Sequence, residues 1–344
     1  MSKITNDDRI TVVYICDDSY AWITGISMIS LFEHNKNATA YVIGQNISSE
    51  NKRKLLQTAE RYDGNCILID IPNRYLPKEL NLRRWPSIVF ARLFLGSLLP
   101  ASVNKVLYLD CDTLVNEDLR PLWDIDVKHS IFSGVKDYIG KKYKENIGLS
   151  STDFYINAGV LLINVDRLRA FPLPERLTAF FKQYYHGISY ADQDVLNSVF
   201  KGKIGCLPSK YNVMTLQLDW AYSDMIKLRH PSNCCSEEEY EYARKSPAIV
   251  HFTEHLLSTR PWFENSNHPY VEHFAKYKAD SLWNDQPLAV KFHTGYRARI
   301  STIYELLPEK ILFPIIGFIH AVYFPCYISA KQQFHRWRIR HDDI

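Results

Sequence analysis

Short apolar runs and longer helical patterns alternate along the first third of the chain. Apolar runs of strand length, each followed by polar residues, occur at Ile10–Cys16, Ala40–Ile43, Cys66–Ile71 and Lys105–Leu109. Helical patterns lie between them at Tyr20–His34, 48–62 and Ser87–Leu98, and the second opens with the capping-like sequence Ser48-Ser49-Glu50. This alternation predicts an α/β fold, with a single Rossmann-like, mainly parallel sheet and helices on both faces.

The second half of the chain is less regular. Strands are predicted at Tyr155–Asn164 and Ala248–Phe252, and helices at Leu173–Tyr185, Ala191–Phe200 and 268–283. Asn212–Ser246 is rich in tyrosine and charge, and we predict an irregular segment there. We place a domain boundary near Pro287, which divides the chain into a main domain, 1–287, and a C-terminal region, 288–344.

The end of the fourth apolar run carries the candidate chemistry. Asp110-Cys111-Asp112 follows this run, and alternate residues of an extended chain point the same way. The two carboxylates then converge while Cys111 faces the opposite side. Converging carboxylates repel unless a cation lies between them, so the triplet indicates a metal site at the strand end, where open α/β sheets bind ligands. Turns and helix caps also use this triplet, but turns rarely follow so clean an apolar run.

Composition indicates the cellular location of the protein more than its function. The 344 residues suit one large α/β domain with an appendage, and a net charge of +3 points to no particular partner, so we predict no nucleic-acid partner. The seven cysteines are scattered, without the spacing of a zinc ribbon or a disulfide framework, and Met1–Arg9 lacks the apolar core of a signal peptide. We therefore expect a reducing, cytoplasmic location. The first strand is not followed by the glycine pattern of a dinucleotide-binding loop.

Four short motifs follow one another along the chain. They are Asp110-Cys111-Asp112, Asn157-Ala158-Gly159, Asp192-Gln193-Asp194, and His251 followed by Arg260-Pro261-Trp262. In this order they resemble glycosyltransferase family 8, above all its bacterial branch of lipopolysaccharide-type α-galactosyl- and α-glucosyltransferases. The resemblance covers roughly residues 10–265. It implies a GT-A catalytic domain, a UDP-galactose or UDP-glucose donor, a divalent ion on the diphosphate, and retention of anomeric configuration.

The resemblance also assigns residues to roles. Asp110, Asp112 and His251 match the metal ligands; oxygen ligands suit Mg²⁺ or Mn²⁺, and the imidazole favours Mn²⁺. The residues that match positions on the UDP-sugar are Ile15, Asp17, Ser19, Arg92, Asp110, Cys111, Asp112, Asp137, Asn157, Asp192, Gln193 and Arg260. Tyr14 and Tyr20 are alternative candidates for stacking on the base.

Asp192 and Gln193 match the pair beside the anomeric carbon, whereas we expect Asp194 to be a helix cap. Retention allows a covalent glycosyl-enzyme, for which Asp192 is the candidate nucleophile, or attack from the face of departure. An amide is a poor nucleophile. Gln193 therefore favours same-face attack, in which it stabilises the oxocarbenium-like centre and the departing phosphate oxygen takes the acceptor's proton.

The segment after His251 departs from the family pattern. It is longer, carries Glu254 in place of a glycine, and offers Arg260 for the usual lysine. An arginine still binds phosphate, and does so in a bidentate way. His255 is a competing candidate ligand.

The C-terminal region holds the basic excess of the chain, with eight Lys/Arg against four Asp/Glu in 288–344. Residues 311–330 carry no formal charge and have the length of a membrane span, but Pro314, His320 and Pro325 interrupt them. A span would also carry a basic flank across the membrane: Lys331, Arg336, Arg338 and Arg340. We favour an aromatic and basic segment in the cytoplasmic membrane interface over a span or a hairpin packed on the main domain. The protein is then peripheral to the inner face of the plasma membrane, and its acceptor is a lipid-linked saccharide such as a lipopolysaccharide core or a surface polysaccharide intermediate.

Two other functions fit parts of the sequence. A UDP-sugar or glycan binding protein of the same fold, without catalysis, is favoured only by the unusual segment after His251. A nucleotidyltransferase also pairs aspartates on a related sheet, but nothing in the sequence resembles a triphosphate-binding loop.

Overall fold

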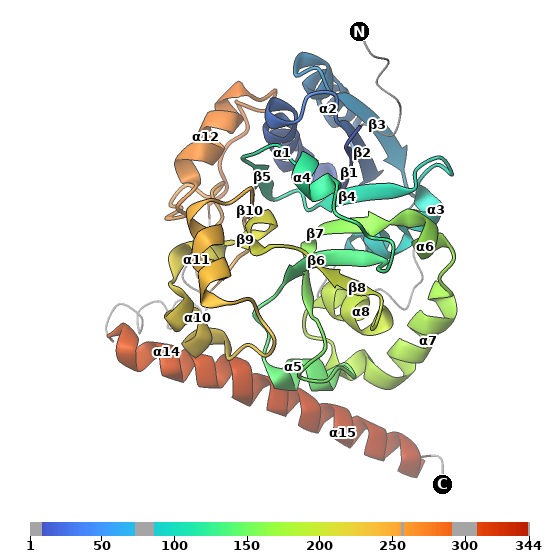
Figure 1. Ribbon diagram of the computed structural model, residues 1–344, viewed down its shortest axis with the longest axis vertical. Coiled ribbons are helices and arrows are strands. Elements are labelled where there is room, and N and C mark those ends of the chain that lie inside the picture. The colour runs from blue at the N-terminus through green and yellow to red at the C-terminus, as the bar shows by residue number, and fades with distance from the viewer. Residues whose placement is uncertain (1–8, 73–85, 256–257, 291–307, 343–344) are drawn as a thin grey trace.

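A seven-stranded sheet forms the centre of the molecule (Figure 1). The computed structural model describes residues 9–72, 86–255, 258–290 and 308–342. The strands lie in the order β3-β2-β1-β4-β7-β6-β8. In chain order they are Thr11–Asp17 (β1), Thr39–Gln45 (β2), Asn65–Asp70 (β3), Lys105–Leu109 (β4), Phe132–Lys136 (β6), Ile156–Asn164 (β7) and Ile204–Cys206 (β8). Only β7 runs against the others in this sheet, which confirms the prediction of a mainly parallel sheet.

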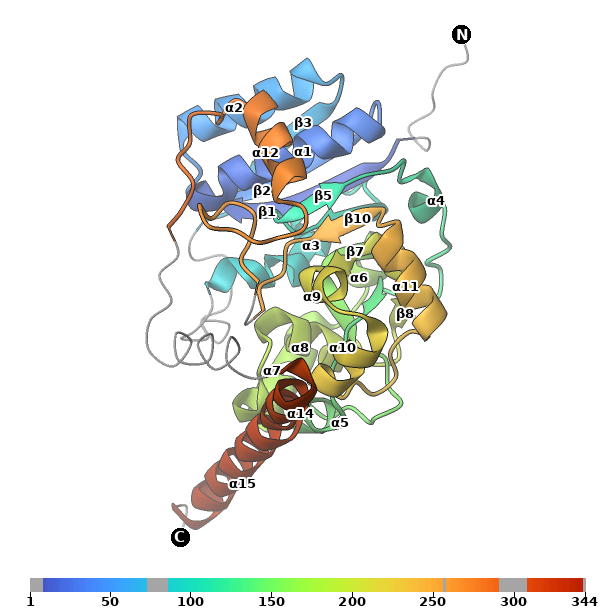
Figure 2. The same ribbon diagram turned by 90° about the vertical axis from the view of Figure 1, so that its left-hand side faces the viewer.

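Helices cover both faces of this sheet. One face packs on α1 (Ala21–His34) and α2 (Ser49–Arg61), which lie on the same side of the sheet as α12 (Val271–Asp280) in Figure 2. The opposite face is covered by α3 (Leu95–Leu98), α6 (Val165–Arg169), α7 (Leu173–Tyr184) and α8 (Ala191–Val199). Successive strand residues enter opposite cores, with Val12 on the α1 side and Val13 on the α8 side. The buried runs predicted from the sequence are therefore buried because both faces are covered.

The predicted helix at Ser87–Leu98 is only partly α-helical. Ser87–Phe94 forms a 3-10 helix, η4, and only the following four residues are α-helical. This tighter winding buries Phe90 and Leu93 in the core together with the Arg92 side chain.

The prediction of an irregular segment at Asn212–Ser246 is wrong. The segment contains α9 (Thr215–Asp219), α10 (Tyr222–Arg229) and α11 (Glu237–Lys245). Of its tyrosines, Tyr240 is a core residue, since its ring is fully buried and packs edge-on against Tyr138 and Tyr222, whereas Tyr242 is exposed.

A second, three-stranded sheet stands beside the first, in the order β5-β10-β9. Its strands are β5 (Thr113–Val115), β9 (Val213–Met214) and β10 (Ile249–His251). Because β5 begins just after β4 ends, the chain passes from the large sheet to the small one at Asp110-Cys111-Asp112. The candidate triplet therefore lies between the two sheets.

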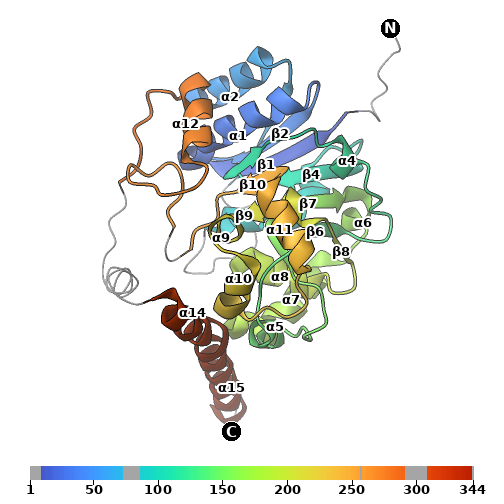
Figure 3. The same ribbon diagram turned by 60° about the vertical axis from the view of Figure 1, so that its left-hand side comes forward.

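The described part of the C-terminal region is one long helix rather than a hairpin. α14 (Glu309–Phe318), a π-helical turn at Ile319–Tyr323 and α15 (Phe324–Asp342) follow without a break, so the hairpin, an alternative that we did not favour, is not formed. In the described part of the chain, one helix, Glu309–His335, is long enough and apolar enough to cross a membrane, judged by length and composition. α14 packs on α10, the first part of α15 packs on α5 (Lys141–Asn146) and on the 3-10 turn Tyr185–Gly187, and the end of α15 extends beyond the body (Figure 3).

Three of the contacts between this helix and the body involve backbone groups. At Gly317 the two backbones approach so closely that a Cβ would lie 1.9 Å from the carbonyl oxygen of Lys227 in α10. In the π-helical turn the N–H of Phe324 bonds to Ile319, which leaves the His320 carbonyl to accept from the Tyr143 hydroxyl at 2.9 Å. The Asn146 side chain donates to the carbonyl of Pro325.

Candidate functional site

Strand pairing brings three distant segments together at one point. Leu109 at the end of β4 pairs with Val160 of β7, and the N–H of Asp110 donates to the carbonyl of Gly159 at 2.7 Å. In the small sheet His251 pairs with Thr113 in antiparallel register. The acidic triplet and the histidine are therefore neighbours because of the register of two sheets, although they are far apart in sequence.

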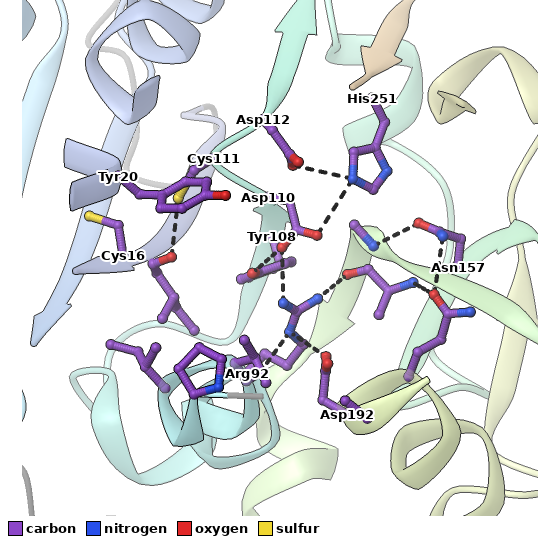
Figure 4. A pocket seen from close by; sticks show the side chains of 18 of the residues that line it. Cys16, Tyr20, Arg92, Tyr108, Asp110, Cys111, Asp112, Asn157, Asp192 and His251 are labelled. Atoms are coloured by element: carbon purple, nitrogen blue, oxygen red, sulfur yellow. Dashed lines mark hydrogen bonds and ion pairs between the residues drawn. The ribbon is translucent and has the colours of Figure 1, made fainter. Parts of the chain in front are cut away.

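Asp110, Asp112 and His251 each turn one ligand atom toward the others, all within 4.8 Å. The Nε2 atom of His251 lies 3.2 Å from Asp112 Oδ1 and 3.6 Å from Asp110 Oδ2 (Figure 4). Two carboxylate oxygens and one imidazole nitrogen form a donor set suited to Mn²⁺. The residues present therefore fit the divalent ion that the sequence implied.

Cations already balance the two carboxylates. Arg260 Nη2 lies 3.1 Å from Asp112 Oδ2, and Arg92 Nη2 lies 2.9 Å from Asp110 Oδ1. Burial alone would raise the pKa of Asp112, but the charges of His251 and Arg260 outweigh it and lower the pKa to about 2. Burial would likewise lower the pKa of His251, but Asp112 outweighs it and raises that pKa. Asp112 is therefore ionised at neutral pH.

Arg92 is buried and joins three segments of the chain through its guanidinium group. Its guanidinium bonds to Asp110, to the carbonyl of Ala158 at 2.6 Å, and to Asp192 Oδ2 at 3.0 Å. Burial raises the pKa of Asp192 to about 6, and the charge of Arg92 limits that rise. Ala191 has a φ of +44°, a strained value for a residue with a side chain, and such strain is common at functional sites.

Gln193 has a partner at each amide atom. Its Oε1 accepts from Asn157 Nδ2 and from the Ala158 N–H, both at 3.1 Å. Its Nε2 donates to Asp137 Oδ2 at 2.8 Å and to the Tyr155 hydroxyl at 3.2 Å. The side chain is therefore held in one orientation beside Asp192.

Asp194 has the cap-like role predicted for it. One carboxylate oxygen accepts from the N–H groups of Ser189 and Tyr190 ahead of α8, and the other accepts from the Tyr155 hydroxyl. It lies outside the cleft, whereas Asp192 and Gln193 line it.

A cleft of about 540 Å³ opens above these residues. The predicted site residues that line it are Ile15, Asp17, Arg92, Asp110, Cys111, Asp112, Asn157, Asp192, Gln193, His251 and Arg260. Two other predicted site residues are not among those that line it, the exposed Ser19 and the buried Asp137. Ser19 donates to Asp17, and Asp137 accepts from Asn157 and Gln193. Asp137 is therefore placed to orient lining residues.

The two tyrosine candidates for base stacking are separated by burial. Tyr14 is fully enclosed and bonds to Ser27, so the suggestion that it stacks on a base is wrong. Tyr20 lines the cleft and accepts a hydrogen bond from Arg260 at 2.9 Å. Cys111 points away from the carboxylates and donates to the Ile15 carbonyl. The predicted extended chain at the triplet is wrong, because Cys111 and Asp112 form a turn between β4 and β5.

In the segment after His251, His255 and Glu254 take different positions. His255 bonds to Asp219 at 2.6 Å, which takes it away from the carboxylate pair, so its candidacy as a ligand is not supported. Glu254 lines the cleft. Residues 256–257 of this segment lie outside the described part of the chain, as do Met1–Asp8.

Sequence reasoning missed Asn212 and Tyr190. Asn212 is fully buried and bonds to both His251 and Asn157. Its signal was a lone amide between the apolar residues Tyr211 and Val213, inside the segment that we predicted to be irregular. Tyr190 lines the cleft and bonds to His320 of the C-terminal helix.

Comparisons with known proteins agree with this geometry. The sequence model of glycosyl transferase family 8 matches residues 11–266. General stress protein A of Bacillus subtilis is 25% identical over 81% of this chain and 96% of its own length. A lipopolysaccharide 1,2-glucosyltransferase of Escherichia coli is 28% identical over 85% of each chain.

A crystal structure of the galactosyltransferase LgtC in complex with donor and acceptor sugar analogues superimposes with a TM-score of 0.67. The two proteins are 27% identical, and the match covers 79% of this chain and 96% of the other. The predicted GT-A fold is therefore confirmed, and the chain belongs to glycosyl transferase family 8.

Proposed function

We propose that this protein is a retaining hexosyltransferase that moves galactose or glucose from a UDP-sugar to a saccharide acceptor. The observation that carries the proposal is the convergence of Asp110, Asp112 and His251 in a cleft that also holds Arg92 and Gln193. The lipopolysaccharide glucosyltransferases and galactosyltransferase among its relatives support this donor and acceptor class.

A divalent ion, Mn²⁺ or else Mg²⁺, would be held by Asp110, Asp112 and His251, and when bound it neutralises charge on the diphosphate leaving group. Arg260 reaches the same region, because its guanidinium lies between Asp112 and Tyr20. A planar guanidinium binds phosphate oxygens in a bidentate way. Arg260 is thus positioned to stabilise charge that grows as UDP departs.

We infer same-face substitution at the anomeric carbon. The bond from that carbon to the diphosphate oxygen breaks, a bond to the acceptor oxygen forms, and the acceptor proton passes to the departing phosphate oxygen. The Gln193 oxygen already accepts two hydrogen bonds, which reduces its power as a nucleophile and leaves its dipole to stabilise positive charge on the sugar ring. Asp192 is the alternative nucleophile, and its pairing with Arg92 weakens it in that role.

We further propose that the protein works at the cytoplasmic face of the plasma membrane on a lipid-linked saccharide. Large apolar residues are exposed along the C-terminal helix: Ile311, Ile315, Phe318, Ile319, Tyr323, Phe324, Tyr327, Phe334 and Trp337. We call this set the outer stripe. A helix with one side packed and an aromatic, apolar other side suits a membrane interface better than water. Its predicted basic flank contributes the described, exposed Lys331.

The decisive experiment is a screen for UDP release from UDP-galactose, UDP-glucose and other UDP-sugars, with and without Mn²⁺. We expect one donor to be turned over only with the ion, and Asp112→Ala to abolish the turnover. The unusual segment after His251, which places Glu254 in the cleft where the family pattern has a glycine, is the observation that favours a non-catalytic binding protein. Binding of a UDP-sugar without any release of UDP, alone or with saccharide acceptors, would favour that alternative.

A further inference from the structure

Asn212 lies directly behind the candidate metal site. It joins the 3-10 helix Ser209–Tyr211 to β9, and its side chain is fully buried. Asn212 Oδ1 is 3.0 Å from Nδ1 of His251, and its Nδ2 donates to Asn157 Oδ1 at 2.9 Å. It therefore joins the candidate metal ligand to the residues that surround Gln193.

Hydrogen bonds link the side chains of Asp137, Asn157, Asn212 and His251 in series, and the direction of each bond can be derived in turn. The backbone N–H of Gly159 can only donate, so the atom of Asn157 that faces it must be Oδ1, and the atom that faces Asp137 at 3.2 Å must be the amide nitrogen. Asn157 Oδ1 accepts from the Gly159 N–H at 2.9 Å. The same oxygen must accept from Asn212, which turns the carbonyl oxygen of Asn212 toward His251. An oxygen there requires a proton on Nδ1 of the imidazole.

The His251 ring has little freedom to escape this arrangement. A Cβ on Gly159 would lie 2.1 Å from the ring atom Cε1, so the ring packs against the bare backbone of β7. The ring is therefore held by packing on one side and by a hydrogen bond at Nδ1. A partner at one imidazole nitrogen decides which tautomer the other nitrogen adopts.

We propose that Asn212 is a positioning residue that fixes His251 in the tautomer protonated at Nδ1, so that the lone pair of Nε2 faces Asp110 and Asp112. The proposal rests on the metal site of the proposed function. Without Asn212, the neighbouring Asp112 carboxylate, 3.2 Å from Nε2, would draw the proton to Nε2 and block the ligand atom. Orienting partners of metal ligands typically contribute about 10- to 100-fold to metal affinity.

Two substitutions at this position separate the roles of its oxygen and its nitrogen. Asn212→Leu keeps the approximate volume and removes both hydrogen bonds, so we expect roughly 10- to 100-fold weaker Mn²⁺ binding. Asn212→Asp keeps an acceptor for Nδ1 but loses the donor to Asn157. We expect it to retain Mn²⁺ affinity within a few-fold while turnover falls, because the support of Asn157 and Gln193 is disturbed.

The experiment uses the full-length protein in two measurements. Electron paramagnetic resonance titration in the presence of UDP gives the Mn²⁺ dissociation constants. Nitrogen NMR of histidine-labelled, metal-free protein at alkaline pH, where the ring is neutral, reports the tautomer without any ion. We expect a proton on Nδ1 of His251 in the wild type and in Asn212→Asp, and on Nε2 in Asn212→Leu.

The matched control is Asn35→Leu. Asn35 is also a buried amide, but it bonds only to backbone groups of α1 and residues 117–119. It should lower thermal stability and leave Mn²⁺ affinity unchanged. A proton on Nε2 in the wild type would overturn the proposal, as would unchanged Mn²⁺ affinity in a folded Asn212→Leu. If the wild type shows the Nδ1 tautomer but binds no Mn²⁺, the positioning role stands and the metal-dependent function fails.

Discussion

The metal end of the cleft and the C-terminal helix are built in opposite ways. At the cleft, Asp112, His251 and Gln193 are each held by two or more polar partners from different segments of the chain. The C-terminal helix is held on one side by a close backbone crossing at Gly317 and by the contacts of His320, while its outer stripe faces outward. The polar side chains of the cleft have their partners within the protein. The apolar side chains of the outer stripe are exposed.

This difference means that substitutions should act differently in the two regions. In the cleft a small change leaves a buried polar group unpaired or moves a ligand atom, which costs activity. On the outer stripe a large change removes only exposed apolar area, which costs association and not folding.

The largest effect should follow from Asp112→Asn. The amide removes the charge that faces His251 and Arg260, so we expect turnover to fall on the order of 10³-fold, the upper range for one preorganised electrostatic contact. Steady-state kinetics with the preferred UDP-sugar measures it. Asp126→Asn, an exposed carboxylate beside Lys128, is the control and should keep full activity. Equal activity in both variants would contradict the assignment of Asp112.

Gly159→Ala tests whether packing positions His251. The added methyl group would lie 2.1 Å from the imidazole, so the ring or β7 must move, and we expect on the order of 10²-fold loss of turnover with weaker Mn²⁺ binding. Gly140→Ala is the matched control, because its Cβ meets its nearest neighbour at 3.5 Å, an ordinary contact. An active Gly159→Ala variant would show that the ring position is not critical.

The double change Phe334→Ser and Trp337→Ser tests the other region. Both rings are exposed, and they stack on each other at 6.0 Å. Loss of their apolar area should weaken partitioning into anionic lipid vesicles by about 3 kcal/mol, on the order of 100-fold, with little change in thermal stability. Vesicle sedimentation measures this. Tyr242→Ser removes an exposed ring on α11 and should not change partitioning. Unchanged binding in the double variant would remove the outer stripe from the proposal.

The smallest expected effect is a pH dependence at the attachment of the helix. Burial, together with the charges of Arg229 and His230, lowers the pKa of His320 to about 3. Between that value and the ordinary pKa of about 6.5, the unfolded chain binds more protons than the folded one, so stability falls as pH decreases below 6.5. The loss should reach at most about 2 kcal/mol between pH 7 and pH 5.

Chemical denaturation of wild type and His320→Gln at these two pH values measures the His320 contribution. A glutamine oxygen can accept from Arg229 as the neutral imidazole does, without a titrating group. The difference in unfolding free energy between pH 7 and pH 5 should therefore be smaller in the variant. Identical differences would show that His320 does not titrate on unfolding.

Sequence alone predicted the elements whose burial is complete on both faces. β1, β2, β4 and β7 are continuous apolar runs, and the acidic triplet follows one of them, so both the sheet and the metal ligands could be predicted. β6 was missed because Phe132–Lys136 contains serine and glycine, which pack only because neighbouring strands approach closely there.

The missed residues depend on contacts between segments distant in sequence. Asn212 gains its role from the pairing of β9 with β10 and from the register of β7, neither of which leaves a local pattern. Tyr240 is a core residue of Asn212–Ser246, and its ring packs on Tyr138 from another segment. The local periodicity of apolar residues does not predict contacts between segments that are distant in sequence.

The π-helical turn at Ile319–Tyr323 sets the rotational phase of everything that follows it. Each residue advances an α-helix by about 100° about its axis, so one residue more or fewer in this turn would rotate α15 by more than a quarter turn relative to α14. The rings of Phe334 and Trp337 would then point elsewhere relative to α14 and to the contact of His320 with Tyr190. The π-helical turn therefore fixes the direction in which the outer stripe faces relative to the cleft.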